Sequence, residues 1–135
     1  MVTNAVRIKT DPDPYEQFFI SQAQRVGDLI FVSGQASIDL NGEIVAGDFE
    51  AQARQSIENL SKVLKAGGSN LDKLVKVTIY VTDISKFDVV MKLRQEYFSF
   101  PYPADTICEV KSLALPELQF EIEAVALAEG EILDA

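Results

Sequence analysis

The sequence predicts an α+β fold, in which a mixed β-sheet carries two helices on one face. Two segments alternate apolar and polar residues as strands do, two others repeat apolar residues at helical spacing, and the elements follow in the order β-β-β-α-β-α-β-β. The second face of such a sheet needs cover, and another subunit could supply it. With 135 residues, the chain (residues 1–135) is predicted to form one domain.

Two hairpins are predicted before the first helix. Residues 18–25 and 29–33 flank a Gly-Asp turn at positions 27 and 28, which is typical of a β-hairpin. Asn41-Gly42 is a second hairpin signal. Ahead of both, Thr10 to Pro14 predicts a turn-rich loop, because each proline fixes its own φ and disfavours helix at the preceding residue.

The first helix is predicted to begin after Asp48 and to end at Gly67-Gly68. Asp48 suits the N-cap position, and Glu50 adds negative charge to the first turn. Glycine ends a helix readily because it adopts the left-handed cap conformation without strain. One face of this helix repeats apolar residues, at Phe49, Ala53, Ile57, Leu60 and Leu64.

The second half of the sequence predicts three strands and one helix. Ser85 and Asp88, three residues apart, resemble a capping box that opens a helix ending before Pro101. The residues of this helix predicted to point inward are Phe87, Val90, Met91 and Phe98. Ala104 to Val110 is predicted to be a strand. Two strands alternate clearly, and each has one buried face. In the first strand this face carries Val75, Val77, Ile79 and Val81, and in the second it carries Phe120, Ile122, Ala124 and Ala126.

The composition excludes several kinds of chemistry. The chain has 21 acidic and 12 basic residues, a formal net charge of −9, no His and one Cys. This charge disfavours nucleic acid as a partner, because the phosphate backbone requires a basic surface. Without His there is no Ser-His or Cys-His dyad and no His-ligated metal, and a single Cys forms no internal disulfide. No segment approaches the roughly 20 apolar residues of a membrane span, so no membrane association and a cytoplasmic location are predicted.

Three groups of short segments occur in a recognisable order and spacing. They are SQA at 21–23 with VGDLIFVSGQ at 26–35; Asn59-Leu60 with AGGS at 66–69 and VKVT at 75–78; and PYPA at 101–104 with Glu109-Val110 and EIEA at 121–124. In this arrangement the chain resembles the RidA (YjgF) family of small proteins over roughly residues 21–128.

The resemblance implies a chorismate-mutase-like fold assembled as a homotrimer, with three clefts between subunits. It also implies a cytosolic deaminase that hydrolyses reactive enamine or imine intermediates to keto acids and ammonia. The partners would then be a small-molecule substrate and other copies of the chain. The family chemistry uses neither a metal nor an organic cofactor, so none is expected.

The resemblance transfers only part of the family's site to this chain. Glu121 matches the glutamate that positions the attacking water, and Ser33 matches a hydroxyl that lines the cleft. Asp105 stands where the family has an arginine that binds the substrate carboxylate. Ile20 stands where the family has a tyrosine, and Met91 replaces an asparagine on the second helix. The scaffold segments are therefore retained while three ligand-handling positions differ.

Asp105 is expected to alter specificity. A guanidinium binds a carboxylate through two parallel bonds, whereas a carboxylate repels it by about 4 kcal/mol at ~4 Å and an effective dielectric constant near 20. The site is therefore expected to favour a neutral or cationic ligand over 2-imino acids. The alternative is that the cleft is closed and Asp105 only caps a loop or pairs with a lysine. If Asp105 and Glu121 face one cleft, they are also expected to share a proton as an acid–base pair; otherwise Glu121 is a solvated strand residue.

Four further residues complete the candidate site or lie beside it. Backbone amides from Asp105 through Thr106 to Ile107 are expected to polarise the substrate together with Ser33. Tyr102 is expected either to anchor a turn or to stack on a planar ligand. Cys108 is expected to be a small buried hydrophobe, because no His is present to activate it as a nucleophile.

The sequence therefore predicts a RidA-like small-molecule deaminase or hydrolase acting on a C–N bond, with water positioned by Glu121 and altered specificity. The alternative is a non-catalytic trimeric protein that binds a metabolite or regulates another process. A ligand that stabilises the protein without being consumed would identify the second class.

Overall fold

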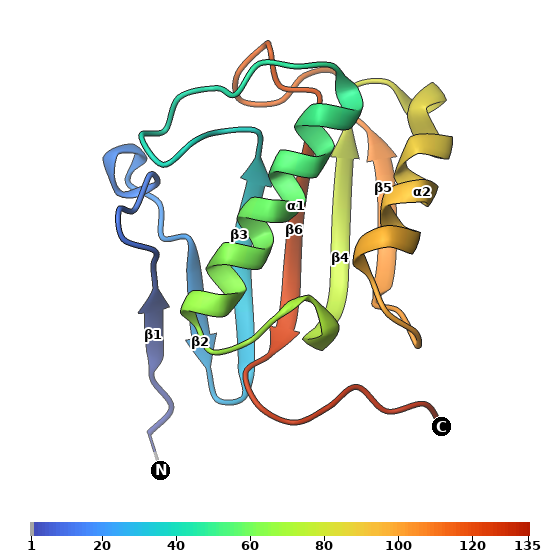
Figure 1. Ribbon diagram of the computed structural model, residues 1–135. Coiled ribbons are helices and arrows are strands. Elements are labelled where there is room, and N and C mark those ends of the chain that lie inside the picture. Colours follow the sequence, from blue (N-terminus) through green and yellow to red (C-terminus); the bar gives the residue numbers. More distant parts are fainter. Residues whose placement is uncertain (1) are drawn as a thin grey trace.

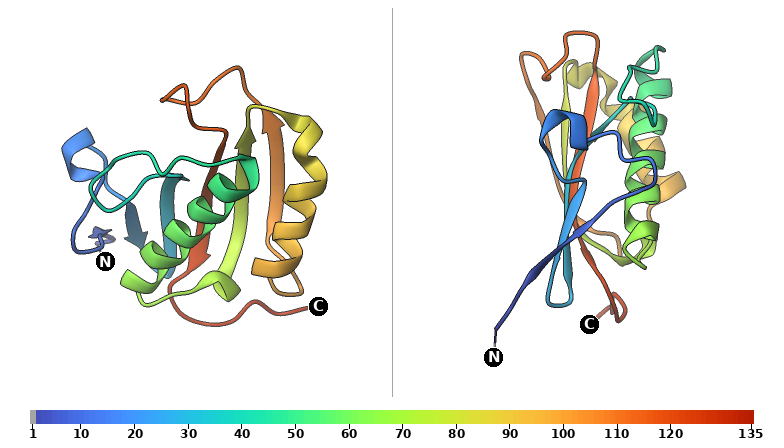
Figure 2. Two further views of the ribbon diagram at one scale, coloured as in Figure 1. Left: turned by 45° about the horizontal axis from the view of Figure 1, so that its top comes forward. Right: turned by 90° about the vertical axis from the view of Figure 1, so that its left-hand side faces the viewer.

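The protein has two layers, a six-stranded sheet and a pair of helices that cover one of its faces (Figures 1 and 2). The computed structural model describes residues 2–135. The helices are α1 (Phe49–Ala66) and α2 (Phe87–Tyr97). The strands are β1 (Ala5–Ile8), β2 (Ala23–Val26), β3 (Leu29–Ala36), β4 (Leu74–Val81), β5 (Ala104–Glu109) and β6 (Phe120–Leu127).

The strand order is β1-β2-β3-β6-β4-β5, so the last strand of the chain lies between β3 and β4. All neighbouring strands are antiparallel except β4 and β5, which are parallel. A parallel pair requires a crossover connection, and α2 provides it. The predicted α+β class, with a mixed sheet and two helices on one face, is confirmed.

The predicted limits of α1 are confirmed. The Asp48 carboxylate accepts a hydrogen bond of 2.9 Å from the backbone N–H of Ala51, which satisfies one of the free donors of the first turn. At the other end Gly68 adopts a φ of +79°, where glycine avoids the strain of a side chain. The predicted apolar face of α1 is buried against the sheet.

The alternation in β6 is confirmed, because Phe120, Ile122 and Ala126 are almost fully buried. In β4 the prediction for Val75 is wrong. The pairing of β4 with β6 shifts register between Leu74 and Lys76, so Leu74 enters the core and Val75 is exposed. An irregularity of this kind reverses the side-chain alternation at one residue, which the apolar pattern alone does not reveal.

The predicted capping box at the start of α2 is wrong. The Asp83 carboxylate instead accepts a hydrogen bond from the backbone N–H of Ser85 and caps a short 3-10 turn, Ile84–Lys86, which runs directly into α2. Among the inward residues predicted for this helix, Val90 and Phe98 are buried as expected; Phe87 and Met91 are exposed. Leu93, which was not predicted, completes the buried side of α2.

Three strands precede α1, as predicted, but one of them is β1, which no turn signal indicates, and the second predicted hairpin is absent. β1 pairs with β2 although its sequence shows little apolar alternation. The hairpin of β2 and β3 is confirmed, but β2 begins only at Ala23 because residues 16–18 form a 3-10 turn. At Asn41-Gly42 there is a turn, closed by a single bridge between Ile38 and Ile44 rather than by two strands.

The face of the sheet opposite the helices is uncovered. It presents apolar side chains from the middle of the sheet, including Phe31, which is 47% exposed, and Leu29. Tyr80 donates a short hydrogen bond to the Glu123 carboxylate on the same face, and this bond raises the pKa of Tyr80 to about 12. None of the helices in the described chain is long and apolar enough to cross a membrane.

Candidate active site

Glu121 lies at the edge of a largely apolar cavity of about 360 Å³. β6 contributes Glu121, the irregular part of β3 contributes Ser33 and Gly34, and the segment before β2 contributes Ile20. The cavity is closed by further residues from the N-terminal segment and from the loops before α1 and β6: Tyr15, Phe18, Ala36, Ile38, Gly42, Ala114, Leu115 and Leu118. None of these lining residues carries a positive charge.

The apolar surroundings alter the acidity of Glu121. Its burial raises the pKa of the carboxyl group above 4.5, and the nearby Glu123 carboxylate raises it further. Gly34 makes room for this side chain, because a Cβ at that position would lie 2.5 Å from Glu121 Oε2. The register of β3 against β6 shifts between Val32 and Gln35, which brings the Gly34 backbone to this position.

Ser33 presents hydrogen-bond acceptors to the cavity. Its hydroxyl donates a hydrogen bond of 2.7 Å to the carbonyl oxygen of Ser21, and its backbone N–H donates one of 2.9 Å to Gln22. With its proton engaged in this way, the Ser33 oxygen offers its lone pairs to an N–H group of a ligand. That Ser33 helps to polarise a substrate stays a prediction, in which this oxygen would act as an acceptor.

Tyr15 is a residue of this cavity that the sequence did not indicate. It is buried, and its hydroxyl donates a hydrogen bond to the carbonyl oxygen of Gly34. Burial and the charge of Glu121 together raise the pKa of Tyr15 well above 10, so the phenol stays protonated. No tyrosine stands at position 20, where Ile20 lines the cavity, but Tyr15 places a phenol in the same wall. The Asp-Pro-Asp-Pro-Tyr sequence identifies only a turn and gives no sign of this contact.

Asp105 lies in a different hollow and is held by Arg94. The guanidinium donates two hydrogen bonds to the carboxylate, Nε to Oδ2 at 2.9 Å and Nη2 to Oδ1 at 2.8 Å. The Asp105 side chain is only 18% exposed and the Arg94 side chain 24%. The guanidinium also lies 5.5 Å from the centre of the Phe87 ring, within range of a cation–π contact. Asp105 is thus ion-paired, as in the alternative interpretation, but its partner is an arginine and not the expected lysine.

The hollow beside this ion pair has a volume of about 500 Å³ and includes two more predicted residues, Met91 and Tyr102. The remaining two predicted residues lie outside both cavities. Thr106 is exposed on the open face of the sheet, where its hydroxyl accepts a hydrogen bond from Lys76. Ile107 packs against the hydrophobic core.

Within one chain Glu121 and Asp105 do not face each other. Asp105 points towards α2, where Arg94 binds it, whereas Glu121 alternates with core residues of β6 and points to the opposite side of the sheet. The expected acid–base pair therefore does not form inside a single copy. Cys108 is exposed, contrary to the expectation that it is buried. Its backbone pairs with Tyr80 on β4, and because alternate residues of β5 face α2, Cys108 faces the open side.

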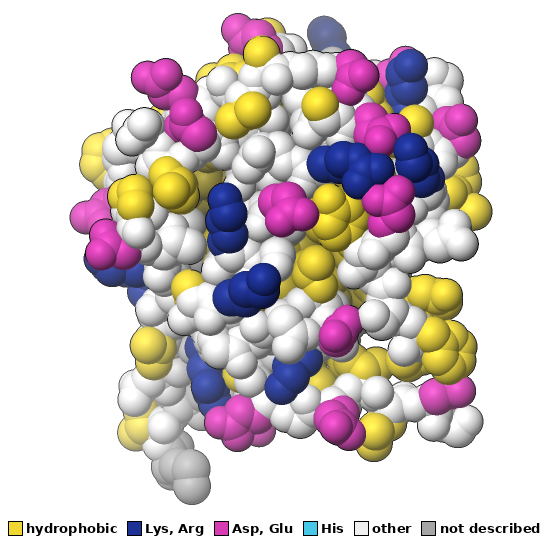
Figure 3. All heavy atoms as spheres, in the orientation of Figure 1, with side chains coloured by type: hydrophobic (Ala, Val, Ile, Leu, Met, Phe, Trp, Pro, Cys, Tyr) yellow, Lys and Arg dark blue, Asp and Glu magenta, His cyan; other side chains and the backbone are white. Residues whose placement is uncertain are grey.

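The charged side chains form no candidate metal cluster among the described residues and no continuous basic patch on the helix-covered face (Figure 3). Among residues 2–135 no group of three or more Cys, Asp or Glu side chains could hold a metal ion. On the helix-covered face, acidic and basic side chains are interspersed and form no continuous basic patch (Figure 3). Part of this pattern is an ion-pair network in which Arg54 of α1 joins Glu50 to Glu96 of α2.

Comparison with known proteins places the chain in a family. Residues 9–128 match the family model described as Endoribonuclease L-PSP. A RutC family protein of Pyrococcus horikoshii is 40% identical over 110 residues, which cover 81% of this chain and 86% of that protein. The chain belongs to the RidA/YjgF family. The human protein named 2-iminobutanoate/2-iminopropanoate deaminase is 37% identical over 109 residues, covering 79% of this chain and 78% of that protein.

Solved structures of the RidA/YjgF family have the same fold. A putative endoribonuclease from Thermotoga maritima superimposes with a TM-score of 0.84 at 38% identity and covers 93% of this chain and 98% of its own. RidA from an Antarctic Psychrobacter has a TM-score of 0.83 at 33% identity, covering 90% and 98%. The family resemblance seen in the sequence is therefore confirmed over most of the chain.

Proposed function

We propose that the protein is a cofactor-free deaminase that hydrolyses the C=N bond of small imines, with Glu121 positioning the attacking water. The observation that carries the proposal is an unpaired, partly buried carboxylate in an apolar cavity, next to the acceptor oxygen of Ser33. The name of the human relative supports the reaction class. The cytoplasm is the expected location.

The proposed reaction needs only water as a second reactant. Glu121 accepts a proton from water as the new C–O bond forms at the imine carbon and passes this proton to the imine nitrogen, which gives a carbinolamine. Glu121 then accepts the proton of the carbinol hydroxyl as the C–N bond breaks and returns it to the leaving nitrogen, so that a carbonyl compound and ammonia are formed. A raised pKa makes Glu121 a better proton acceptor than an ordinary exposed glutamate, provided that it is ionised at the working pH.

The substrate of this site is proposed to be an apolar imine without a carboxylate. The lining of the Glu121 cavity is mostly aromatic and aliphatic and contains no Lys or Arg. The one arginine near the Asp105 hollow already directs two of its nitrogens at Asp105. This pairing cancels the negative charge that the sequence led us to expect, but it also withholds the guanidinium from a substrate carboxylate.

The active assembly is proposed to be a homotrimer with its clefts between subunits. The uncovered face of the sheet, with Leu29 and Phe31 exposed, supports burial against another copy. In such a trimer the Glu121 cavity of one subunit and the Asp105 hollow of the next would together form a cleft. Native mass spectrometry of the full chain would measure the number of subunits.

The reaction is tested with imines generated in situ by amine and amino-acid oxidases, with ammonia release as the readout. Faster turnover of a neutral imine such as that of benzylamine than of 2-iminopropanoate is expected. Glu121→Gln should lower the rate at least 100-fold, because the amide accepts no proton. Glu117→Gln is the matched control, since Glu117 is an exposed carboxylate just before β6 whose backbone alone forms hydrogen bonds in the structure.

Two results would reject this proposal. Equal activity of the Glu121→Gln variant and the wild-type protein would remove Glu121 from the mechanism. Saturable stabilisation by imines without ammonia release would instead establish a non-catalytic binding protein. This second candidate is favoured by the Arg94–Asp105 ion pair, in which each charged group already has its partner within the chain. Cleavage of RNA is disfavoured by the net charge of −9.

A further inference from the structure

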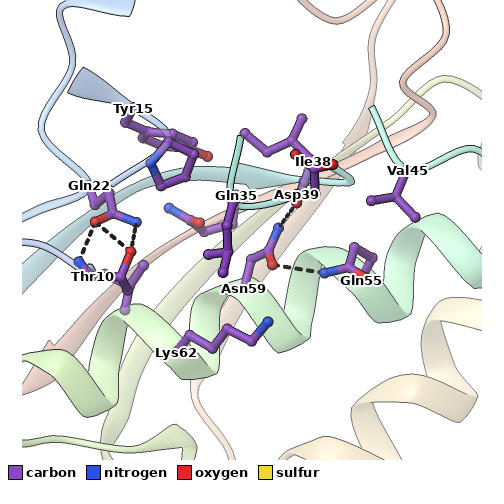
Figure 4. A pocket seen from close by; sticks show the side chains of 13 residues that line it. Thr10, Tyr15, Gln22, Gln35, Ile38, Asp39, Val45, Gln55, Asn59 and Lys62 are labelled. Atoms are coloured by element: carbon purple, nitrogen blue, oxygen red, sulfur yellow. Dashed lines mark hydrogen bonds between the residues drawn. The ribbon is translucent and has the colours of Figure 1, made fainter. Parts of the chain in front are cut away.

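We propose that the protein has a second ligand site, which binds a free α-amino acid. The site is a cavity of about 240 Å³ between α1, the loop after β3 and the segment that joins β1 to β2 (Figure 4). It is called the amide pocket here because four carboxamides and one pair of opposite charges line it: Gln22, Gln35, Gln55, Asn59, Asp39 and Lys62. The proposal does not depend on the deaminase function.

The wall formed by α1 is held in place before any ligand arrives. Gln55, Asn59 and Lys62 lie on one stripe of the helix, because they are spaced by four and three residues. The Asn59 amide donates hydrogen bonds of 2.9 Å to the carbonyl oxygens of both Ala36 and Ile38. The Gln55 amide donates a further bond of 2.9 Å to Asn59 Oδ1. A preorganised wall lowers the entropic cost of binding.

Gln35 provides an amide oxygen that is accessible from the pocket and accepts no hydrogen bond within residues 2–135. Its residue surface is only 2% exposed, and its Nε2 donates to the carbonyl oxygen of Ser33 at 3.0 Å. Within residues 2–135 no hydrogen bond reaches its Oε1. Gln22 is equally buried but is satisfied, because its Oε1 accepts from the backbone of Thr10 at 2.7 Å and its Nε2 donates to the Thr10 hydroxyl. An accessible amide oxygen without a protein partner can accept a hydrogen bond from a ligand that carries an N–H group.

The two charges of the amide pocket define the rest of the ligand. Lys62 forms no ion pair among residues 2–135 and reaches along the pocket from α1 (Figure 4). The Oδ1 atom of Asp39 accepts from the backbone N–H groups of Asn41 and Glu43, whereas no hydrogen bond from this part of the chain reaches Oδ2. The pocket thus offers an ammonium for a carboxylate, a carboxylate for an ammonium, and the amide oxygen of Gln35. A small zwitterion matches all three groups.

The amide pocket is separate from the Glu121 cavity but shares a wall with it. Tyr15 and Ile38 line both cavities, and Glu121 lines only one. The Gln35 amide binds the backbone of Ser33, and Ser33 lines the other cavity. An amino acid bound to Gln35 would therefore contact the segment from Ser33 to Gln35 on the side away from Glu121.

Isothermal titration of the full chain with glycine, L-alanine, L-serine and L-glutamine tests the proposal. At least one of them is expected to bind with a saturable isotherm at millimolar concentration or below. Ethylamine and propionate, which each lack one charge of alanine, should bind at least tenfold more weakly. Lys62→Met should weaken binding at least tenfold, whereas Lys65→Met, at an exposed lysine of the same helix outside the pocket, should not.

Variants that separate the two cavities complete the test. Glu121→Gln should leave amino-acid binding unchanged, because Glu121 does not line the amide pocket. Absence of binding by all four amino acids would overturn the proposal, and so would binding that Lys62→Met leaves intact. Binding abolished by Glu121→Gln would place the ligand in the other cavity and would also overturn it. None of these results depends on ammonia release from imines, so failure here leaves the proposed reaction untouched.

Discussion

Glu121 and Asp105 are both partly buried carboxylates at the rim of a hollow, yet their surroundings differ in one decisive respect. Asp105 is bound by the Arg94 guanidinium through two hydrogen bonds, while the Glu121 carboxylate faces aromatic and aliphatic side chains without a cation. The paired Asp105 carboxylate holds α2 against β5 through its two hydrogen bonds from Arg94. An unpaired carboxylate in apolar surroundings has a raised pKa and is available to accept a proton.

The comparison teaches that the acidic residue expected to redefine specificity acts first as a structural anchor. The structure provides the basic partner that the sequence did not identify, 11 residues earlier on a helix. In the proposed reaction, the lack of a positive charge in the Glu121 cavity would then influence specificity more than the negative charge of Asp105.

The largest effect that would break this contrast is expected at Gly34. Gly34→Ala would place a methyl group 2.5 Å from Glu121 Oε2, so the carboxylate must move. A displacement of about 1 Å at a catalytic group can lower a rate 100-fold. We expect a 10- to 100-fold loss of imine hydrolysis, measured as kcat/KM, with a Tm that changes by only a few degrees. Unchanged kinetics would show that the position of Glu121 does not matter.

A smaller effect is expected on stability at the paired carboxylate. Arg94→Met retains much of the side-chain packing but leaves Asp105 partly buried without its counter-charge. Removing one partner of a fully buried pair costs about 3–5 kcal/mol. Because both side chains keep roughly a fifth of their exposure, we expect about 1–2 kcal/mol, measured by urea unfolding. Arg54→Met, which breaks a more exposed network on α1, should cost less and provides the comparison.

The charge pair also offers a way to alter specificity. Asp105→Arg alone would place two guanidinium groups together and should destabilise the protein without creating a carboxylate site. The exchanged pair Arg94→Asp with Asp105→Arg should keep the ion pair, whereas Arg94→Met with Asp105→Arg frees a guanidinium. Only this last variant, with Ile20→Tyr added to supply the missing phenol, is expected to raise kcat/KM for 2-iminopropanoate, by about tenfold. An equal gain in the exchanged pair would contradict the argument.

The smallest expected effect concerns pH. Because Glu121 must be ionised to accept a proton, activity should rise with pH through its raised pKa, at a pH above 4.5. Glu123→Gln removes the second cause of that shift and should move the acidic limb of the kcat/KM profile to lower pH. The contribution of Glu121 to the free energy of unfolding should change in the opposite direction and fall as pH rises. A carboxyl with a raised folded-state pKa stabilises the native state below its unfolded pKa, and this contribution is lost as pH rises through the folded value.

Glu121→Gln should therefore gain stability relative to wild type as pH rises from 4 to 8, although it loses activity. Thermal unfolding at several pH values measures the difference between the two proteins. A difference that stays constant over this range would mean that Glu121 titrates like an exposed glutamate, and the contrast with Asp105 would then disappear.

The elements whose pattern is local could be predicted from the sequence alone. Asp48 and Gly67-Gly68 set the limits of α1, the alternation from Phe120 to Ala126 defined β6, and short segments such as VGDLIFVSGQ identified the family. These signals depend on spacing within a few residues, and so they are visible without the fold. The family resemblance, and not a local pattern, pointed to Glu121 and Ser33, which the structure places in one cavity.

The contacts of these residues became known only from the tertiary structure. The register shift that exposes Val75, the contact of Tyr15 with Gly34 and the pairing of Arg94 with Asp105 all arise between segments that are distant in sequence or on different elements. Side-chain pairing and burial depend on how the layers pack, and no local sequence pattern encodes this packing. For the same reason the sequence could name Glu121 and Asp105 together, while the structure places them on opposite faces of the sheet.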